Sequence, residues 1–135
     1  MWVFFNNSFL SVVDKAPDPA NLVVRARVEG HIEAVFPNAK VIRDASCDYL
    51  FRAFIPRELV AQAMMEAVMG IDYSNFKNSI RDNRYHDACS RVWGVMSGLQ
   101  PVRPYSGRKS DSNYDLFDQP AQKQAAGRAK RGGRK

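Results

Sequence analysis

The chain of 135 residues has only two cysteines, Cys47 and Cys89, and they are far apart in the sequence. It has only two histidines, His31 and His86, and no CxxC or HxxxH spacing. Zinc would therefore need four ligands from separate elements, so we expect no bound metal. In a reducing compartment two such thiols are more typical of small core residues than of a disulfide.

Long hydrophobic runs are also missing. No stretch approaches the roughly 20 consecutive apolar residues that span a bilayer, and the start MWVFFNNSFL lacks the basic region and cleavage site of a signal peptide. These absences predict a cytoplasmic protein without membrane contact.

The motifs that mark common enzyme classes are absent from the sequence. It contains no glycine-rich phosphate loop, no GxSxG elbow and no HExxH pair. We therefore expect no cofactor and no catalytic residues, and predict that the protein is not an enzyme.

One run, NFKNSIRDNRYHDACSRVW at 75–93, gathers reactive side chain types and needs an explanation. On a helix, Cys89 falls on the same side as Tyr85, Val92 and Met96, which predicts a buried, inert thiol. Asp87 is one turn before Arg91 and three residues after Arg84, and His86 is one turn after Asp82, so ordinary surface pairs account for the charges. A Cys89–His86 nucleophile pair, or a nuclease or hydrolase using Asp82, His86 and Asp87, is the weaker alternative.

Charge is unevenly distributed along the chain. Residues 1–100 hold eleven basic and eleven acidic residues, so residues 101–135 supply the whole net charge of +6. After Pro101 the sequence has few branched apolar residues and no hydrophobic period, which predicts a disordered basic tail over 101–135. The remaining residues, 1–100, are predicted to form one compact domain.

Two segments of the tail suggest binding. Residues 113–119, NYDLFDQ, are predicted to be a short docking motif through Tyr114, Leu116 and Phe117, although a loop lying on the domain surface fits equally well. The last thirteen residues carry six cations and no acid, a composition that suits phosphate contacts. These candidate nucleic-acid-binding residues are Lys123, Arg128, Lys130, Arg131, Arg134 and Lys135. A solubilising tail without a partner is the alternative.

Hydrophobic patterning predicts the secondary structure of the domain. Strands are expected in a hairpin over 2–13 and at 22–28, 40–43 and 48–55, and helices at 29–36, from Pro56 to Gly70, at 76–80 and at 85–99. Val60, Ala63, Met64, Ala67 and Val68 should form the inner stripe of the second helix, and Tyr85, Cys89, Val92, Met96 and Leu99 that of the last one.

This order of elements predicts an α+β fold. We expect an antiparallel sheet with helices packed on one face, built on a ferredoxin-like split β-α-β-β-α core with an N-terminal hairpin and extra C-terminal helices. The uncovered sheet face should be rich in aromatic residues.

Basic residues of the domain are further candidates for nucleic-acid binding. Arg25, Arg27 and Arg52 lie on predicted strands and should share a sheet face with aromatic residues, while Lys77, Arg81 and Arg84 precede or begin the last helix. Solvated pairing with Asp48, Glu29 and their neighbours is an equally good interpretation of any single arginine. No Gly-aromatic-x-aromatic run typical of RNA-recognition sheets occurs in WVFF or DYLFRAFI.

Several segments resemble a family of short bacterial and phage-borne proteins to which no established activity is attached. They are the Met-Trp start, VRARV at 24–28, DYLFRA at 48–53, IDYSNFKNSI at 71–80 and HDACSRVWGVM at 86–96. The resemblance covers roughly residues 1–100 and implies a compact domain. Members commonly end near the last helix, so the basic extension is a departure.

Together these features predict a non-enzymatic binding protein of bacterial or phage origin. Its domain would recognise a macromolecular partner while the basic tail contacts nucleic acid or a nucleoprotein. An inhibitor or regulator directed at a host protein, without nucleic-acid contact, is the alternative.

Overall fold

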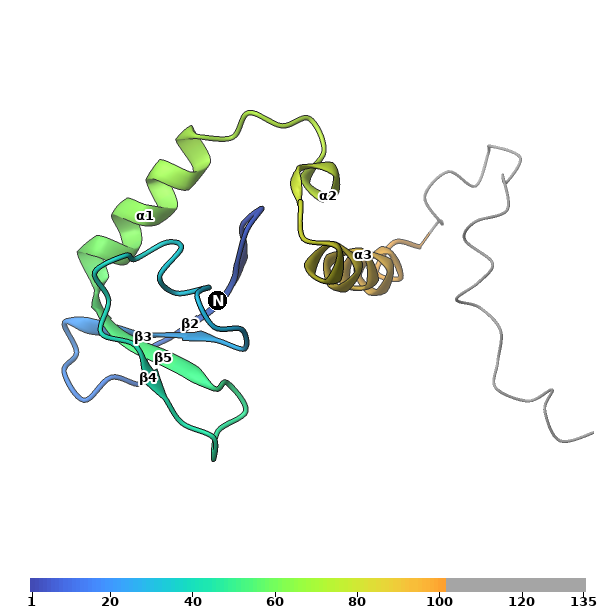
Figure 1. Ribbon diagram of the computed structural model, residues 1–135. Coiled ribbons are helices and arrows are strands. Elements are labelled where there is room, and N and C mark those ends of the chain that lie inside the picture. The colour runs from blue at the N-terminus through green and yellow to red at the C-terminus, as the bar shows by residue number, and fades with distance from the viewer. Residues whose placement is uncertain (102–135) are drawn as a thin grey trace, which may run out of the picture. The chain divides into compact units, whose positions relative to one another are not determined.

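The computed structural model describes residues 1–101, in which five strands form one antiparallel sheet (Figure 1). The strands are β1 (Trp2–Phe4), β2 (Phe9–Val13), β3 (Asn21–Ala26), β4 (Ile42–Arg43) and β5 (Phe51–Pro56), and their order in the sheet is β1-β2-β3-β5-β4. The helices are α1 (Arg57–Met69), α2 (Phe76–Ser79) and α3 (Asn83–Ser97). The chain divides into two units, Met1–Val95 and Met96–Lys135, and the sheet belongs to the first.

The N-terminal hairpin forms as the sequence predicts. β1 pairs antiparallel with β2, and the Phe5 N–H donates to the Ser8 carbonyl oxygen at 2.8 Å across the turn. The two asparagines between these residues suit such a turn because Asn tolerates αL backbone conformations. The amino group of Met1 donates to the Val12 carbonyl oxygen at 2.7 Å, which extends the pairing to the first residue.

The strands β3 and β5 form the centre of the sheet, and their alternation separates two faces. Val24 lies opposite Ala53 and Ala26 opposite Phe51, and all four side chains are buried in the core. Arg25 lies opposite Arg52 and Val23 opposite Phe54 on the other face. We call this second side the open face. It carries Trp2, Phe4, Phe9, Ser11, Val13, Val23, Arg25, Ile42, Arg52 and Phe54.

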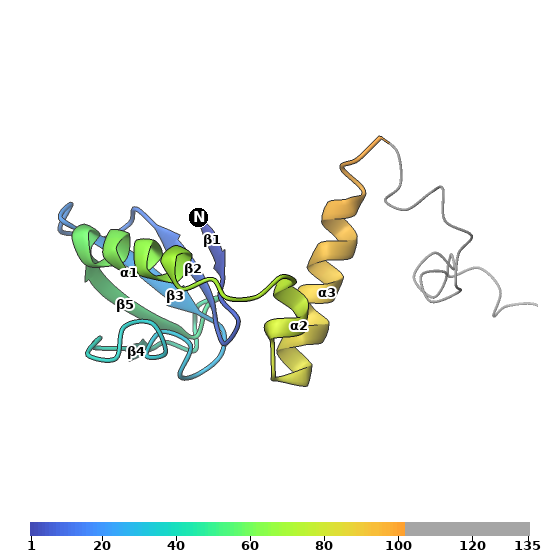
Figure 2. The same ribbon diagram turned by 90° about the horizontal axis from the view of Figure 1, so that it is seen from above.

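The core face of the sheet is covered by α1 and by residues 27–41. Figures 1 and 2 show both segments on the same side of the strands. Val60 of α1 and Ile32 and Phe36 of the connection join Leu10 and Val24 in one buried hydrophobic cluster. The interior therefore lies between the sheet and these two segments.

The helix predicted at 29–36 is wrong, because residues 29–35 form turns. Two hydrogen bonds have helical spacing, from Ala34 N–H to the Gly30 carbonyl and from Phe36 N–H to the Ile32 carbonyl, but they do not propagate. Gly30 has a positive φ of 83° at one end, and Pro37 follows at the other. The few residues between them are too short for a stable helix, because helix nucleation is costly.

The α+β class is confirmed, whereas the ferredoxin-like split core is not. β5 lies between β3 and β4 and is antiparallel to both, but the segment joining β3 to β4 lacks the helix that this arrangement requires. The predicted strands at 40–43 and 48–55 are shorter or shifted, and are observed at Ile42–Arg43 and Phe51–Pro56.

The helix α1 has the predicted ends, with Pro56 before its first turn and Gly70 after its last. Its inner stripe is correct in part. Val60 is buried and Ala63, Met64 and Ala67 are partly buried, but Val68 is exposed. Apolar residues also occupy the outer side of the helix, as shown by the exposed Leu59, Met65 and Met69.

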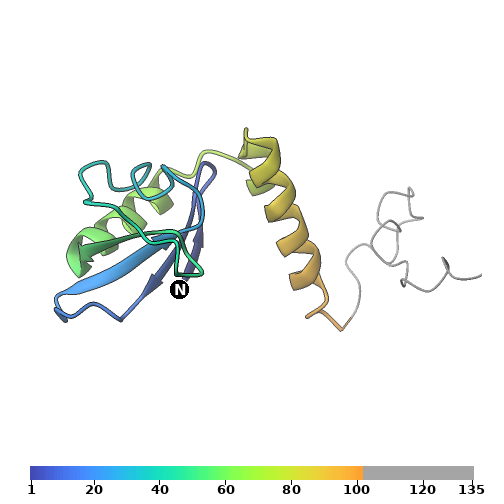
Figure 3. The same cartoon turned by 60° about the horizontal axis from the view of Figure 1, so that its bottom comes forward.

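The helix α3 is tied to the N-terminal hairpin through its first turn (Figure 3). The Tyr85 hydroxyl lies 2.9 Å from the Phe5 carbonyl oxygen and 2.7 Å from that of Ser8, and shares its proton between them. The ring of Tyr85 also meets His31 edge-on, and Nδ1 of His31 accepts the Phe9 N–H at 3.1 Å. Because the His31 side chain is partly desolvated, its pKa is lowered, which favours the neutral form that this acceptor role needs.

The predicted stripe of α3 is buried only in its first half. Cys89 is buried and Tyr85 is partly buried, but Val92, Met96 and Leu99 are exposed. Helical periodicity correctly identified an apolar side of this helix, but it could not show which turns have packing partners.

Candidate nucleic-acid interface

One row of side chains crosses the open face and includes a residue from every strand of the sheet. Strand register places Trp2 opposite Ser11, Ser11 opposite Arg25, Arg25 opposite Arg52 and Arg52 opposite Ile42. Directly opposed residues project to the same side of a sheet, so two arginines stand side by side at the middle of the row.

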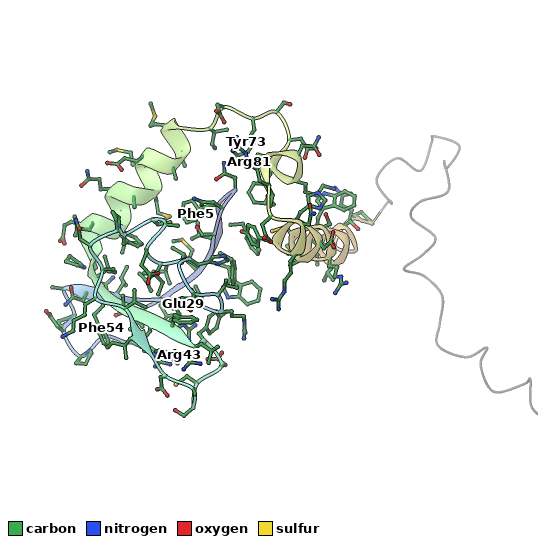
Figure 4. The ribbon with its side chains drawn as sticks, viewed as in Figure 1. Phe5, Glu29, Arg43, Phe54, Tyr73 and Arg81 are labelled. Carbon is green, nitrogen blue, oxygen red and sulfur yellow. The ribbon has the colours of Figure 1, made fainter. Side chains whose placement is uncertain are left out.

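Aromatic rings lie near the arginine pair on β1, β2 and β5. Trp2, Phe4 and Phe9 form a cluster on β1 and β2, in which the Phe9 centroid is 5.9 Å from that of Trp2 and 4.7 Å from that of Phe4. Phe54 projects from β5, two residues after Arg52 on the same strand (Figure 4). Trp2 is 66% exposed and Phe54 is 43% exposed, so both rings are accessible at the surface.

Two arginines of the β3 segment, Arg25 and Arg27, are positioned by the buried Tyr49. The guanidinium carbon of Arg25 lies 4.5 Å from the centroid of the Tyr49 ring, and that of Arg27 lies 4.2 Å from it. Arg25 Nη2 also donates to Ser11 Oγ at 2.8 Å, and Arg27 Nη1 donates to the Asp48 carbonyl oxygen at 2.6 Å. Stacking on an aromatic face fixes a guanidinium while its charge is retained.

Within residues 1–101, the positive charge of the arginine pair is compensated in part, by the carboxylate of Asp44. Arg52 Nη2 is 4.0 Å from Asp44 Oδ2, at the limit of an ion pair. Hydrogen bonds from the Ser46 side chain and backbone, and then from Cys47, hold the pKa of Asp44 down to about 2. The carboxylate is therefore ionised but already engaged by its own loop, and its charge is exposed to solvent screening.

Two atoms of the arginine pair lack hydrogen-bond partners. The Nε atoms of Arg25 and Arg52 are buried and have no acceptor within residues 1–101. An unsatisfied buried donor costs about 1–3 kcal/mol, and more when the group is charged. The remaining parts of the two guanidinium groups are held by Ser11, Tyr49 and Asp44, so two ordered cations stand side by side, and this makes the open face the strongest candidate site in the described part of the chain.

The structure brings together only some of the predicted basic residues. Arg25 and Arg27 meet at Tyr49, and Arg52 stands beside Arg25 in the sheet. Lys77 lies on α2 with its Nζ 4.1 Å from the Trp93 ring centroid, Arg81 lies between α2 and α3 (Figure 4), and Arg84 is on α3. The other candidates, Tyr114, Leu116, Phe117, Lys123, Arg128, Lys130, Arg131, Arg134 and Lys135, lie outside the described residues.

The contacts made by the run at 75–93 are structural. Asp82 accepts the Tyr85 N–H at 2.6 Å at the start of α3, and His86 Nδ1 is 3.5 Å from Asp87 Oδ1. The predicted pairing of Asp87 with Arg84 or Arg91 is not observed, and the Asp87 carboxylate instead lies beside the imidazole of the adjacent His86. Within residues 1–101, no three His, Cys, Asp or Glu side chains gather closely enough to hold a metal ion.

The predicted burial of Cys89 is confirmed, since this side chain is 5% exposed. Desolvation raises the pKa of its thiol, which disfavours the thiolate that a nucleophile requires. The geometry therefore describes a core thiol beside Tyr85.

Replacing Cys89 with Ser should destabilise the fold while leaving any activity per folded molecule intact. The hydroxyl is more polar than the thiol in this buried position, and the expected loss in the free energy of unfolding is about 1–3 kcal/mol. Urea denaturation measures the loss. Unchanged stability with complete loss of function would instead favour the nucleophile.

Sequence reasoning missed Tyr49, Ser11, Trp2 and Phe54 as members of the site. The alternation in DYLFRAFI did place Phe54 on the same side as Arg52, so that neighbour could have been found. The contact of Tyr49 with two arginines of β3 depends on how the loop before β5 returns to the sheet, and no local pattern encodes it.

No helix within the described residues is long and apolar enough to cross a membrane. No family model, curated protein or solved structure matches the chain.

Proposed function

We propose that this chain is a non-enzymatic binding protein whose open face contacts nucleic acid, either free or within a nucleoprotein. The proposal rests on the cross-strand pair of Arg25 and Arg52, which shares the open face with the accessible rings of Trp2 and Phe54 and faces one carboxylate, Asp44, at 4.0 Å from Arg52. A bacterial or phage-borne origin and a cytoplasmic location belong to the same proposal.

Phosphate is the ligand group that best fits the arginine pair. The guanidinium fork matches phosphate geometry and binds it through charge-assisted hydrogen bonds. Arg25 is already ordered by Tyr49 and Ser11, so less side-chain entropy is lost when it binds. The six cations of residues 123–135, outside the described residues, would add attraction that is independent of base sequence.

A regulator directed at a host protein is the second candidate function. Its support is the outer side of α1, where Leu59, Met65 and Met69 are exposed and no charge other than Glu66 occurs between residues 59 and 69. Exposed apolar patches of this kind, and methionine-rich ones in particular, are typical of protein-binding surfaces. Binding that survives high salt and removal of the tail would favour this function.

The finer description of the fold is also a proposal. The position of β5 between β3 and β4 supports a split arrangement related to the ferredoxin-like core, with turns in place of its first helix. The strand β2 then takes the place beside β3 that the last strand fills in that fold.

A double substitution tests the nucleic-acid function. Arg25→Gln with Arg52→Gln should weaken binding to oligonucleotides and reduce the slope of log affinity against log salt. Each lost phosphate contact contributes about 0.7 to this slope for a single strand, so the expected reduction is about 1.4. Fluorescence anisotropy at four salt concentrations measures both quantities.

Two further variants provide controls. Lys40→Gln with Arg91→Gln removes the same charge from exposed positions off the open face and should leave the slope nearly unchanged. Arg25→Lys with Arg52→Lys keeps the charge and should retain most of the slope. If the double Gln variant melts like the parent protein and shows the same affinity and slope, the open face does not contact phosphate.

A further inference from the structure

We infer that the open face selects single-stranded nucleic acid, with bases stacking on Trp2 and Phe54 and phosphates held by Arg25 and Arg52 on the same face. This inference rests on the proposed function and adds the form of the ligand. DNA and RNA share the chemistry concerned, since both offer unpaired bases and a phosphate backbone.

The first argument is the accessibility of the rings. A base can stack only on a ring that is accessible to solvent, and Trp2 and Phe54 have much of their surface exposed, whereas Tyr49 is 3% exposed and covered by arginines. In a duplex the bases are stacked on each other and unavailable to side chains of this kind. Exposed aromatic rings beside arginines therefore favour an unpaired strand.

The second argument is spacing. The row places Trp2 on β1, three strand spacings from Arg52 on β5, and Phe54 lies two residues further along β5. With strands about 4.8 Å apart and about 3.3 Å per residue, the two aromatic positions are separated by roughly 16 Å. At a stacked rise of about 3.4 Å per nucleotide this distance accommodates about five nucleotides, and fewer in an extended strand.

The third argument is the position of the charge. Arg25 is on β3, between the strands that carry the two aromatic positions, and Arg52 is two residues from Phe54 on β5, so both cations flank the path of a strand bound at both ends. Ser11 and Ile42 complete the row without adding a negative charge, and Asp44, the nearest carboxylate, is engaged by Ser46 and Cys47. The arrangement of rings and cations on the open face thus resembles the stacking platforms and cationic grooves that bind single strands.

The test uses the full-length chain with oligo(dT), oligo(dU) and oligo(rU) of three to twelve nucleotides and with a duplex of mixed sequence. Affinity for the single strands should rise most steeply with length up to about five nucleotides, at which the open face is filled, and it should exceed affinity for the duplex. Trp2→Ala and Phe54→Ala should each weaken single-strand binding by about 5- to 100-fold, the range expected for loss of one base–aromatic stack. Comparison of oligo(dU) with oligo(rU) shows whether the 2′-hydroxyl contributes, because these two differ only in the sugar.

Matched variants distinguish the loss of base stacking from a loss of folding. Trp2→Phe keeps a ring and should restore most of the affinity that Trp2→Ala loses. Leu59→Ala removes an equally accessible apolar side chain from α1 and should not change binding. In a Trp93→Phe background, Trp2 is the only tryptophan, and its fluorescence should be quenched when the single strand binds.

The outcomes distinguish this inference from the function on which it rests. Equal affinity for duplex and single strand, or wild-type affinity in both Ala variants while the double Gln variant is weakened, would overturn single-strand selection and leave phosphate binding intact. Failure of every oligonucleotide to respond to substitution of Arg25 and Arg52 would overturn both.

Discussion

The Ile32→Ala variant should lose about 2–5 kcal/mol of its free energy of unfolding, the range measured when a large buried aliphatic side chain is truncated. Ile32 is fully buried, and it packs from the connection between β3 and β4 into the cluster formed by Leu10, Val24 and Val60. The substitution removes this contact and leaves a cavity under a segment that has little regular hydrogen bonding of its own. Urea denaturation followed by circular dichroism measures the loss.

A second substitution in the same connection serves as the control. Val28 is 49% exposed, so Val28→Ala should change the free energy of unfolding by less than about 0.5 kcal/mol. A small effect of Ile32→Ala, equal to that of Val28→Ala, would show that residues 27–41 do not contribute to the core as the structure describes.

The connection between β3 and β4 also shows how far sequence patterns can predict this fold. The apolar residues Ile32 and Phe36 of this segment are buried in the core, and Val35 is partly buried against it. The expected helix is nevertheless absent from this segment, because Gly30 and Pro37 limit its length. In this segment the apolar spacing therefore indicates the buried side chains, whereas the backbone that carries them is not helical.

Local signals were sufficient for the hairpin and for α1. The β-branched and aromatic runs joined by two asparagines correspond to β1 and β2, and the boundaries at Pro56 and Gly70 are those of α1. In α3 the apolar stripe was found, but the exposure of Val92 and Met96 depends on contacts remote in sequence. Propensity and periodicity describe one element at a time and contain no information on its neighbours.

The candidate site was predictable in part for the same reason. Alternation along β3 placed Arg25 on the face opposite to Val24 and Ala26, and alternation along β5 placed Arg52 with Phe54. The register that sets Arg25 directly opposite Arg52, and the contact of Arg25 with Tyr49, require the folded sheet. A one-residue change of register would send these side chains to the other face, so the pair is a property of the tertiary structure.

Removal of residues 121–135 should cause the largest change in nucleic-acid affinity, because this segment holds six cations and no acid. If all six neutralise phosphates on duplex DNA, the slope of log affinity against log salt should fall by about 5, so raising the salt from about 50 to about 200 mM should cost the parent chain about three orders of magnitude more in affinity than the truncated chain. Any base preference should persist in the truncated chain, because phosphate contacts position a protein without reading sequence. Titration of both chains at several salt concentrations, with melting temperatures measured in parallel, tests this expectation.

Two controls for this deletion keep the length of the chain. One changes only the charge of residues 121–135, and the other changes only the order of these residues in the sequence. Replacing the six cations with Gln should reproduce the deletion, because only their charge is expected to matter. A chain with residues 121–135 in scrambled order should bind like the parent, since counterion release depends on the number of charges and not on their sequence. Equal salt slopes for the parent and the truncated chain would show that this segment touches no phosphate, and nucleic-acid binding would then rest on Arg25, Arg52 and the rings of the open face alone.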